Sequence, residues 1–425
     1  MSACSSIDVL PPSQALRVSG LFAHTPAPHA APFTAGKARG FDLRLLGVSA
    51  AGFCVFLSVY ATQALLPMLA SVFHASALHA SLTVTATTVA VALGAPAIGL
   101  LAERIGRKVV IVTAIFALAV PTLLAATAGG LNSLIGWRFV QGLIMPGIIA
   151  VTMAYVAEEW PAGRTGAAMS AYVSGNVLGG VTGRLMSGWI AGRFGWNYAF
   201  LVLGLIDLAG GAVVLTALPP SGKVARPGKL STSVREMARH LSNRKLLAAF
   251  ASGFNILLAL VAAFTYVTFH LASPSFGLGP AALGSLFLVY LVGVVVTPIG
   301  GRFIDRRGQR HAMLIALTLA ITGILLTLIP SLIAIMAGLA LCSSGIFVCQ
   351  AATASHMGIV AGKARASASG LYASFYYAGG AAGAFIPGLF WKLGGWPATV
   401  GFIVVVLMVT AGIAGRAWNR VAAVS

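Results

Sequence analysis

The sequence is poor in charged residues, and above all in acidic ones. Only 8 of its 425 residues are Asp or Glu, and charged residues of both signs make up 8% of the chain, whereas 58% are hydrophobic. An ordinary soluble domain has about a quarter of its residues charged, so this composition excludes one. We therefore expect the chain to lie in a lipid bilayer.

Groups of residues that would support catalysis or metal binding are also lacking. The four cysteines, Cys4, Cys54, Cys342 and Cys349, show no Cys-x-x-Cys spacing and have no His at the intervals that metal ligands need. No span or loop gathers a Ser, His and acid set or a phosphate-binding loop. The sequence therefore predicts that the protein is not an enzyme, that it carries no cofactor, and that its cysteines are free thiols.

What the sequence does contain is a series of apolar runs long enough to cross a bilayer. They lie near residues 45–70, 80–101, 109–128, 131–157, 167–191, 197–218, 246–271, 281–300, 312–329, 332–357, 368–391 and 397–415. The predicted fold class is an all-α membrane protein with twelve transmembrane helices.

The basic residues predict how these spans are oriented. Of the 27 Lys and Arg residues, Arg138 and Arg184 lie within spans and Arg193 and Lys392 lie on one side of the membrane. All the others lie on the opposite side, which the positive-inside rule assigns to the cytoplasm. We expect an inner (plasma) membrane protein with both termini in the cytoplasm. The net charge of +19 then needs no nucleic-acid partner, because these side chains lie beside an anionic leaflet.

A repeat about 200 residues long divides the chain into two halves. Gly99 to Lys108 and Gly301 to Arg310 share one pattern: Gly, three residues, an acid, Arg, any residue, Gly, any residue, a base. The fifth and eleventh spans also match at an offset of 200, with Tyr172 on Tyr372 and Trp196 on Trp396. We predict two pseudo-symmetric six-helix bundles, residues 45–218 and 246–416. A disordered cytoplasmic tail (1–44), a cytoplasmic linker (219–245) and a second tail (417–425) complete the chain.

Two sets of residues are predicted to serve movement. In the repeated turns, a glycine would let one helix approach its neighbour, and Glu103 or Asp305 would pair with Arg across the seam between the halves. The alternative is a tight basic turn with no such role. The fifth span presents Gly175, Gly179 and Gly183 as a flat packing face. The candidate latch residues are Gly99, Glu103, Arg104, Gly106, Arg107, Gly301, Asp305, Arg306, Gly308 and Arg310.

Polar side chains inside the spans are the candidate solute-binding residues, because they are costly in lipid unless they line water or pair. Tyr60 and Gln63 share one face of the first span, and Arg138 and Gln141 share one face of the fourth. For Arg138 the alternative is that neighbouring backbone carbonyls satisfy it. The weaker candidates, whose polar groups often only join helices, are Asn255, Gln350, Tyr372 and Tyr376.

Asp207 is the one acid deep within a predicted span, and this makes it the candidate for proton coupling. It and Arg184 lie at similar depths on either side of the turn near Trp196, so the two are expected to pair. The pair is either a structural clamp or a switch that protonation of Asp207 would break, with Arg138 as a second cation nearby.

These motifs resemble those of the major facilitator superfamily, over nearly the whole chain from Leu45 to Arg416. The turn at Gly99 is similar to the family's loop motif, with Glu103 where Asp is usual. Arg138, Gln141 and Gly142 resemble the fourth-helix motif of drug:proton antiporters, and the fifth-helix glycines resemble theirs without the usual Pro. Several segments look most like the arabinose-efflux (YnfM-type) branch. The resemblance implies two bundles, a central cavity that opens alternately to each side, and export driven by protons, although the first span lacks the acid that such antiporters often carry.

Three functions remain open at this point. The first is a secondary transporter, expected to be monomeric, that exports a sugar or an amphipathic drug-like compound coupled to protons. The second is a transporter that takes up an organic anion with Arg138 as the carboxylate partner. The third is a membrane sensor or scaffold that has the fold but transports nothing.

Overall fold

The computed structural model describes residues 42–161, 163–220, 240–361 and 365–418. The chain beyond Asp42 forms one unit, and the fold below is that of this unit. The predicted tails (1–44 and 417–425) and the predicted linker (219–245) lie mostly outside the described residues.

The described residues are almost entirely helical and contain no strand. The first half comprises α1 (Leu43–Val59), η1 (Ala61–Leu65), α2 (Leu66–Val72), α3 (Ala77–Ile105), α4 (Arg107–Ala125), α5 (Leu131–Ile144), α6 (Pro146–Glu159), α7 (Thr165–Phe194) and α8 (Trp196–Ala217). The second half comprises α10 (Arg244–Ala272), α11 (Pro280–Ser285), η2 (Leu286–Val289), α12 (Tyr290–Arg307), α13 (Gln309–Leu326), α14 (Leu332–Ala361), α15 (Arg365–Phe385) and α16 (Pro387–Ala417).

These helices make twelve spans, six in each half. Ten helices of the described chain are long and apolar enough to cross a membrane, and α7 and α15 complete the twelve. These two helices are rich in Gly, Ser and Ala, which are less hydrophobic than Leu, Ile and Val. Most spans extend a few residues beyond the predicted bounds; the second runs from Ala77 to Ile105. The eleventh crosses a break at Ile386 and ends where Gly394 and Gly395 leave helical geometry inside α16.

The two halves use the same glycine turns. Gly106 and Gly308 have φ of 94° and 80°, and Gly195 and Gly395 have φ of 103° and 58°. Residues other than glycine rarely adopt this region, so the repeat in the sequence is explained by backbone geometry. We call the end that carries the Gly106 and Gly308 turns the basic end, and the end with the other two the opposite end.

The glycine face on α7 packs directly on α1. A Cβ atom on Gly175, Gly179 or Gly183 would collide with the backbone carbonyl groups of Ser49, Phe53 and Leu57, respectively. In the second half Gly379 and Gly383 of α15 lie in the same way on Phe254 and Leu258 of α10. Both sets are spaced by four residues, so two helix backbones touch along matching ridges.

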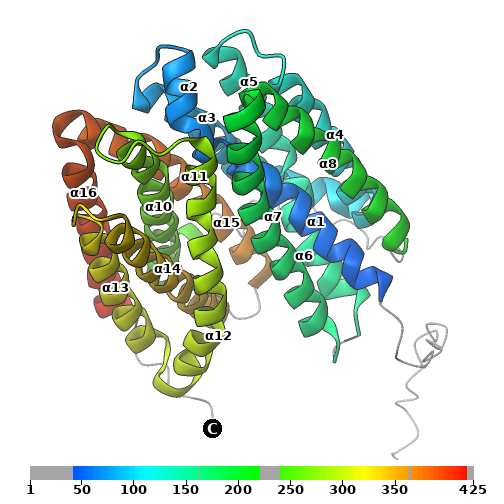
Figure 1. Ribbon diagram of the computed structural model, residues 1–425. Coiled ribbons are helices and arrows are strands. Elements are labelled where there is room, and N and C mark those ends of the chain that lie inside the picture. Colours follow the sequence, from blue (N-terminus) through cyan, green and yellow to red (C-terminus); the bar gives the residue numbers. More distant parts are fainter. Residues whose placement is uncertain (1–41, 162, 221–239, 362–364, 419–425) are drawn as a thin grey trace, which may run out of the picture. The chain divides into compact units, whose positions relative to one another are not determined.

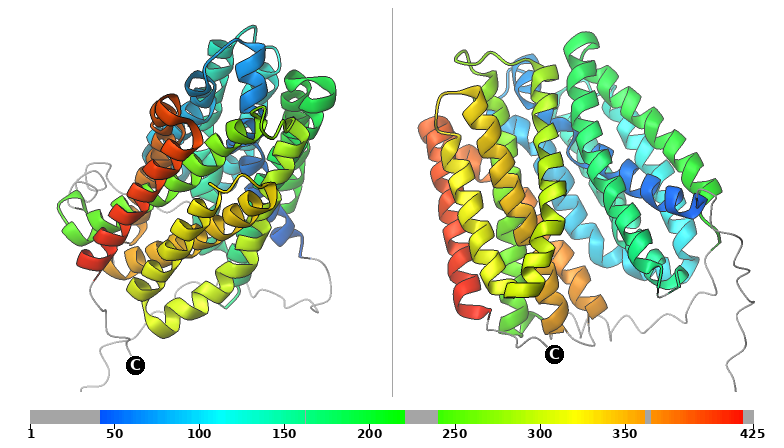
Figure 2. Two further views of the ribbon diagram at one scale, coloured as in Figure 1. Left: turned by 60° about the vertical axis from the view of Figure 1, so that its left-hand side comes forward. Right: turned by 60° about the horizontal axis from the view of Figure 1, so that its bottom comes forward.

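The halves lie side by side. Figure 1 shows α10, α13, α14 and α16 on the left and α1, α4, α6, α7 and α8 on the right. The right-hand view of Figure 2 shows most of the long helices running in one general direction, as expected for a bundle in a single membrane. Close contacts join the halves at the opposite end, where a Cβ on Gly188 of α7 would collide with Pro280 of α11 and one on Gly388 would meet Leu78 of α3.

Candidate functional site

The first span is interrupted near its middle, beside the predicted site residue Tyr60. Helix α1 ends at Val59, Tyr60 adopts φ −118° and ψ 17°, and one 3-10 turn follows. Pro67 lies in the first turn of α2 and has no N–H to donate. The N–H of Gln63 bonds the carbonyl oxygen of Tyr60 in this 3-10 turn and not that of Val59. The last carbonyl groups of α1 therefore need partners from elsewhere.

Arg138 of α5 supplies those partners. It donates from Nη1 to the carbonyl oxygen of Ser58 (2.8 Å), from Nη2 to that of Val59 (2.5 Å) and from Nε to that of Thr83 (3.4 Å), and it also bonds the side-chain oxygen of Gln141. Its side chain is fully buried. In this conformation Arg138 offers no free face to a solute, contrary to the expectation. The alternative interpretation, an arginine satisfied by backbone carbonyls, matches these contacts.

Asp207 of α8 bonds to the same break. The Ser58 hydroxyl donates to Oδ2 of Asp207 at 3.0 Å, while Oδ1 has no hydrogen-bond partner among the described residues and Asp207 is fully buried. Thr122 lies beside this carboxyl group and accepts a 2.9 Å bond from Nε2 of Gln141. Asp207 and Arg138 are thus connected through Ser58 and through Gln141 and Thr122, without a direct ion pair.

The predicted pair between Arg184 and Asp207 is not formed. Arg184 of α7 donates from Nε to Oε1 of Gln63 (2.8 Å) and from Nη1 to the carbonyl oxygen of Gly180 (2.6 Å). Both residues reach the first span, but Asp207 meets it at Ser58 and Arg184 at Gln63. Those positions are five residues apart, about 7.5 Å along a helix at ~1.5 Å per residue. The pair was predicted from the similar depth of the two residues in the membrane. Depth does not determine toward which neighbour each side chain points.

Aromatic rings surround Arg184. Its guanidinium carbon lies 4.9 Å from the ring centre of Tyr60, 4.8 Å from that of Phe287 and 5.3 Å from that of Tyr290. These rings lie at the two 3-10 segments, since Tyr60 precedes η1, Phe287 belongs to η2 and Tyr290 follows η2. Each interruption of a span therefore delivers aromatic side chains to the same cation.

Gln63 connects the halves. Its amide nitrogen donates to the hydroxyl of Thr265 on α10 at 3.1 Å, while its oxygen holds Arg184. Tyr266, the next residue on α10, donates to the Ser81 hydroxyl of α3 at 3.2 Å. Arg184 and Gln63 therefore lie at the contact between the halves, whereas Arg138 lies inside the first one.

The remaining predicted residues differ in their surroundings. Tyr372 and Tyr376 of α15 stack with ring centres 5.9 Å apart. The hydroxyl groups of Tyr60 and Tyr372 are buried, and neither has a hydrogen-bond partner within the part of the chain that the structure describes. Asn255 and Gln350 are half-buried. The structure thus places Tyr60 and Gln63 against Arg184 and stacks Tyr372 on Tyr376, whereas Arg138 and Gln141 belong to the Asp207 network.

Sequence reasoning missed several members of these clusters. Ser58, Thr122 and Thr265 carry key hydrogen bonds, but single hydroxyl residues are common in apolar spans and gave no signal. Phe287 and Tyr290 were missed because no proline marks the break at η2. Aromatic residues concentrated within one short stretch of the eighth span were the signal that was available.

The repeated turns differ in their charge contacts. In the first half Arg107 pairs with Glu158 at the end of α6, within that half. In the second half Asp305 and Arg306 are exposed, and within the described ranges neither forms an ion pair, so the expected pairing of Asp305 across the seam is not present here. The side chains of Glu103 and Arg104 lie outside the described set. A Cβ atom on Gly301 would meet no other atom within 4 Å, so no neighbouring helix packs closely against this glycine, contrary to the expectation.

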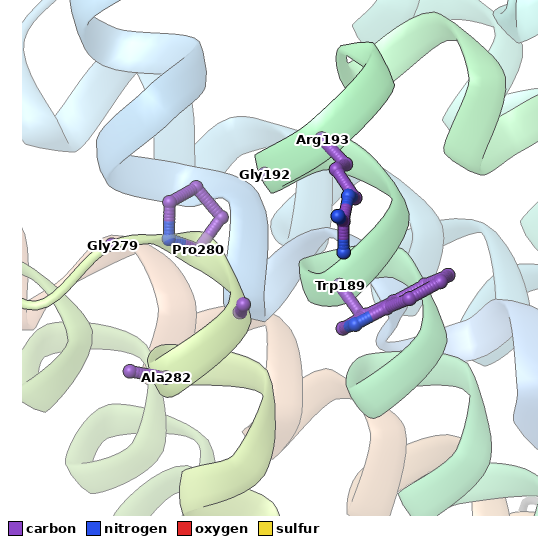
Figure 3. A pocket seen from close by; sticks show the side chains of 7 residues that line it. Trp189, Gly192, Arg193, Gly279, Pro280 and Ala282 are labelled. Atoms are coloured by element: carbon purple, nitrogen blue, oxygen red, sulfur yellow. The ribbon is translucent and has the colours of Figure 1, made fainter.

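A surface hollow of about 410 Å³ lies at the opposite end, between α7 and α11. Figure 3 shows Trp189 and Arg193 of α7 facing Pro280 of α11 across it. The hollow marks the outer edge of the contact between the halves, beyond Arg184.

Comparisons with known proteins agree with this architecture. The family model described as Major Facilitator Superfamily matches residues 48–356 and 256–421. The chain belongs to the major facilitator superfamily. It is 34% identical to the MFS-type transporter YybF of Bacillus subtilis over 86% of this chain and 91% of that protein. It is 32% identical to the inner membrane transport protein YnfM of Escherichia coli, over 88% and 90% of the two chains.

A solved structure shows the same fold. A bacterial homologue of the human lysosomal transporter Spinster, in an inward-facing and unoccupied conformation, superposes with a TM-score of 0.71 at 15% identity, over 89% of this chain and 98% of that one. Membership of this family makes the protein a multi-pass membrane transporter of small molecules, not an enzyme. The predicted resemblance to the YnfM branch is confirmed.

Proposed function

We propose that the protein is a secondary transporter that moves a small organic solute by alternating access, with the basic end in the cytoplasm. The solute site is the cluster around Arg184, Gln63 and Tyr60, where residues of both halves meet. Two features support this: the halves touch closely at the opposite end, at Gly188 and Pro280, and both span interruptions lie beside the cluster. The described conformation is then the one closed to the outside.

Asp207 is the coupling group in this proposal, and its bond to Ser58 at the end of α1 is the observation that carries it. An ionised carboxylate accepts a strong bond from the Ser58 hydroxyl, whereas a protonated acid accepts a weaker one. Proton uptake would therefore loosen the end of α1, which Arg138 holds from the other side. Because Tyr60 and Gln63 follow directly, a proton at Asp207 changes the solute site. The protein then exports its solute in exchange for protons when the solute is released on the outside.

Proteoliposomes test the coupling. Solute exchange without a pH gradient is compared with accumulation driven by a gradient, for neutral sugars, aromatic amines and aromatic carboxylates. The Asp207→Asn variant is expected to retain solute exchange. Its gradient-driven accumulation is expected to fall at least tenfold, because the amide carries no titratable proton. The exchange reaction is the internal control. Accumulation at the wild-type level in Asp207→Asn would remove Asp207 from the mechanism.

A further inference from the structure

Arg184 is a buried cation that no acid of the described residues neutralises. It is 4% exposed, and no Asp or Glu of the described residues pairs with it. Of the 8 acids in the sequence, only Asp207 lies deep within a span, and it is bonded to Ser58 on a different part of the first span. A lone charge within a membrane bundle is costly and marks a function by default.

The donors of Arg184 are partly used and partly free. Nε is held by Gln63 and Nη1 by the carbonyl group of Gly180, while Nη2 has no acceptor among the described residues. The hydroxyl of Tyr60 is buried and likewise has no hydrogen-bond partner in the described ranges. The free guanidinium edge and the hydroxyl of the Tyr60 ring, whose centre lies 4.9 Å from the guanidinium carbon, can both donate hydrogen bonds to one missing acceptor.

The surrounding side chains define the body of the missing group. Tyr60, Phe287 and Tyr290 cover the guanidinium. Aromatic walls of this kind suit a flat apolar group, whereas a sugar would need several polar partners.

We infer that Arg184 and the rings around it bind the transported solute, and that this solute is a small organic anion with a carboxylate on a flat, apolar or aromatic body. This inference rests on the proposed transport function and names its substrate class. It replaces Arg138 by Arg184 as the carboxylate partner. The carboxylate bonds Nη2 and the Tyr60 hydroxyl, and the charge of Arg184 is balanced only while solute is bound.

Three probes with one ring and three charge states test it: benzoate, benzamide and benzylamine. Binding to the purified full chain in detergent is measured by isothermal titration calorimetry and thermal shift. The wild type is expected to bind benzoate at least tenfold more tightly than the other two. Arg184→Gln is expected to lower benzoate affinity at least tenfold. Arg193→Gln is the matched control, since it removes the same charge from an exposed position of the same helix, and is expected to change affinity less than twofold.

Tyr60→Phe keeps the inference testable if Arg184→Gln fails to fold. It removes only the orphan hydroxyl, and about a threefold loss of benzoate affinity is expected. Equal or absent binding of all three probes by the wild type overturns the inference, as does full benzoate affinity in both variants. If the wild type exchanges a sugar or an amine in proteoliposomes and Arg184→Gln does so equally, transport stands and the anion site is wrong. If benzoate binds but no solute is exchanged, the transport function itself fails.

Discussion

The two halves share a scaffold but differ in their chemistry. Both have positive-φ glycines at equivalent turns and glycine faces on equivalent helices. The positions of Arg138, Arg184 and Asp207 correspond in the second half to the apolar residues Ala340, Ala384 and Leu407. The glycine turns and packing faces are duplicated, whereas the buried Arg and Asp side chains of the described spans all lie in the first half.

The first helix of each half shows how this difference arises. Helix α1 stops at Val59, and its last carbonyl groups are held by Arg138, whereas α10 runs unbroken from Arg244 to Ala272. An unbroken helix bonds its own interior carbonyl groups and needs no arginine, which explains why Ala340 suffices opposite Arg138. Pro67 in the first turn of α2 corresponds to Thr268 inside the unbroken α10, which has an N–H to donate.

The largest expected effect comes from breaking the shared scaffold. Gly179→Val and Gly379→Val each place a side chain against a carbonyl group of the facing helix, Phe53 or Phe254. Each is expected to cost about 3 kcal/mol or more and to reduce the folded fraction, because backbone contacts cannot give way. Size-exclusion profiles and apparent Tm in detergent measure this. Gly412→Val, where a Cβ meets nothing, is the control. A harmless Gly379→Val would show that the halves do not share this packing.

A smaller effect, confined to the first half, is expected from Arg138→Lys. One ammonium group cannot bond the carbonyl groups of Ser58, Val59 and Thr83 together, so a loss of about 2 kcal/mol is expected. The exposed Arg302 of α12 provides the control Arg302→Lys, which should leave the apparent Tm unchanged. Wild-type stability in Arg138→Lys would mean that the end of α1 does not depend on this arginine.

The sequence predicted the fold well because its signals are local or repeated. Apolar length predicted the spans, and Gly106 and Gly308 recur because the backbone demands them. The site was predicted only in part. Arg138 and Arg184 look alike in the sequence, and only the rotation of α5 and α7 about their axes determines that one faces the interior of a half and the other the contact between halves. The break at η2 brings Phe287 and Tyr290 to Arg184. No proline within or directly after η2 indicates this break in the sequence.

The smallest effect should distinguish the two turns at the basic end. Arg107 pairs with Glu158 in the first half, whereas the equivalent Gln309 makes a 3.4 Å bond to Ser355 in the second. Glu158→Gln is expected to cost about 0.5 kcal/mol at ~0.05 M salt and less at ~0.5 M, because the Glu158 side chain is exposed and its pair is screened. Ser355→Ala should cost less and show no salt dependence, since a long bond between neutral groups contributes little. Apparent Tm at the two salt concentrations measures both. An equal, salt-independent loss in the two variants would mean that the charge asymmetry between the halves does not extend to their turns.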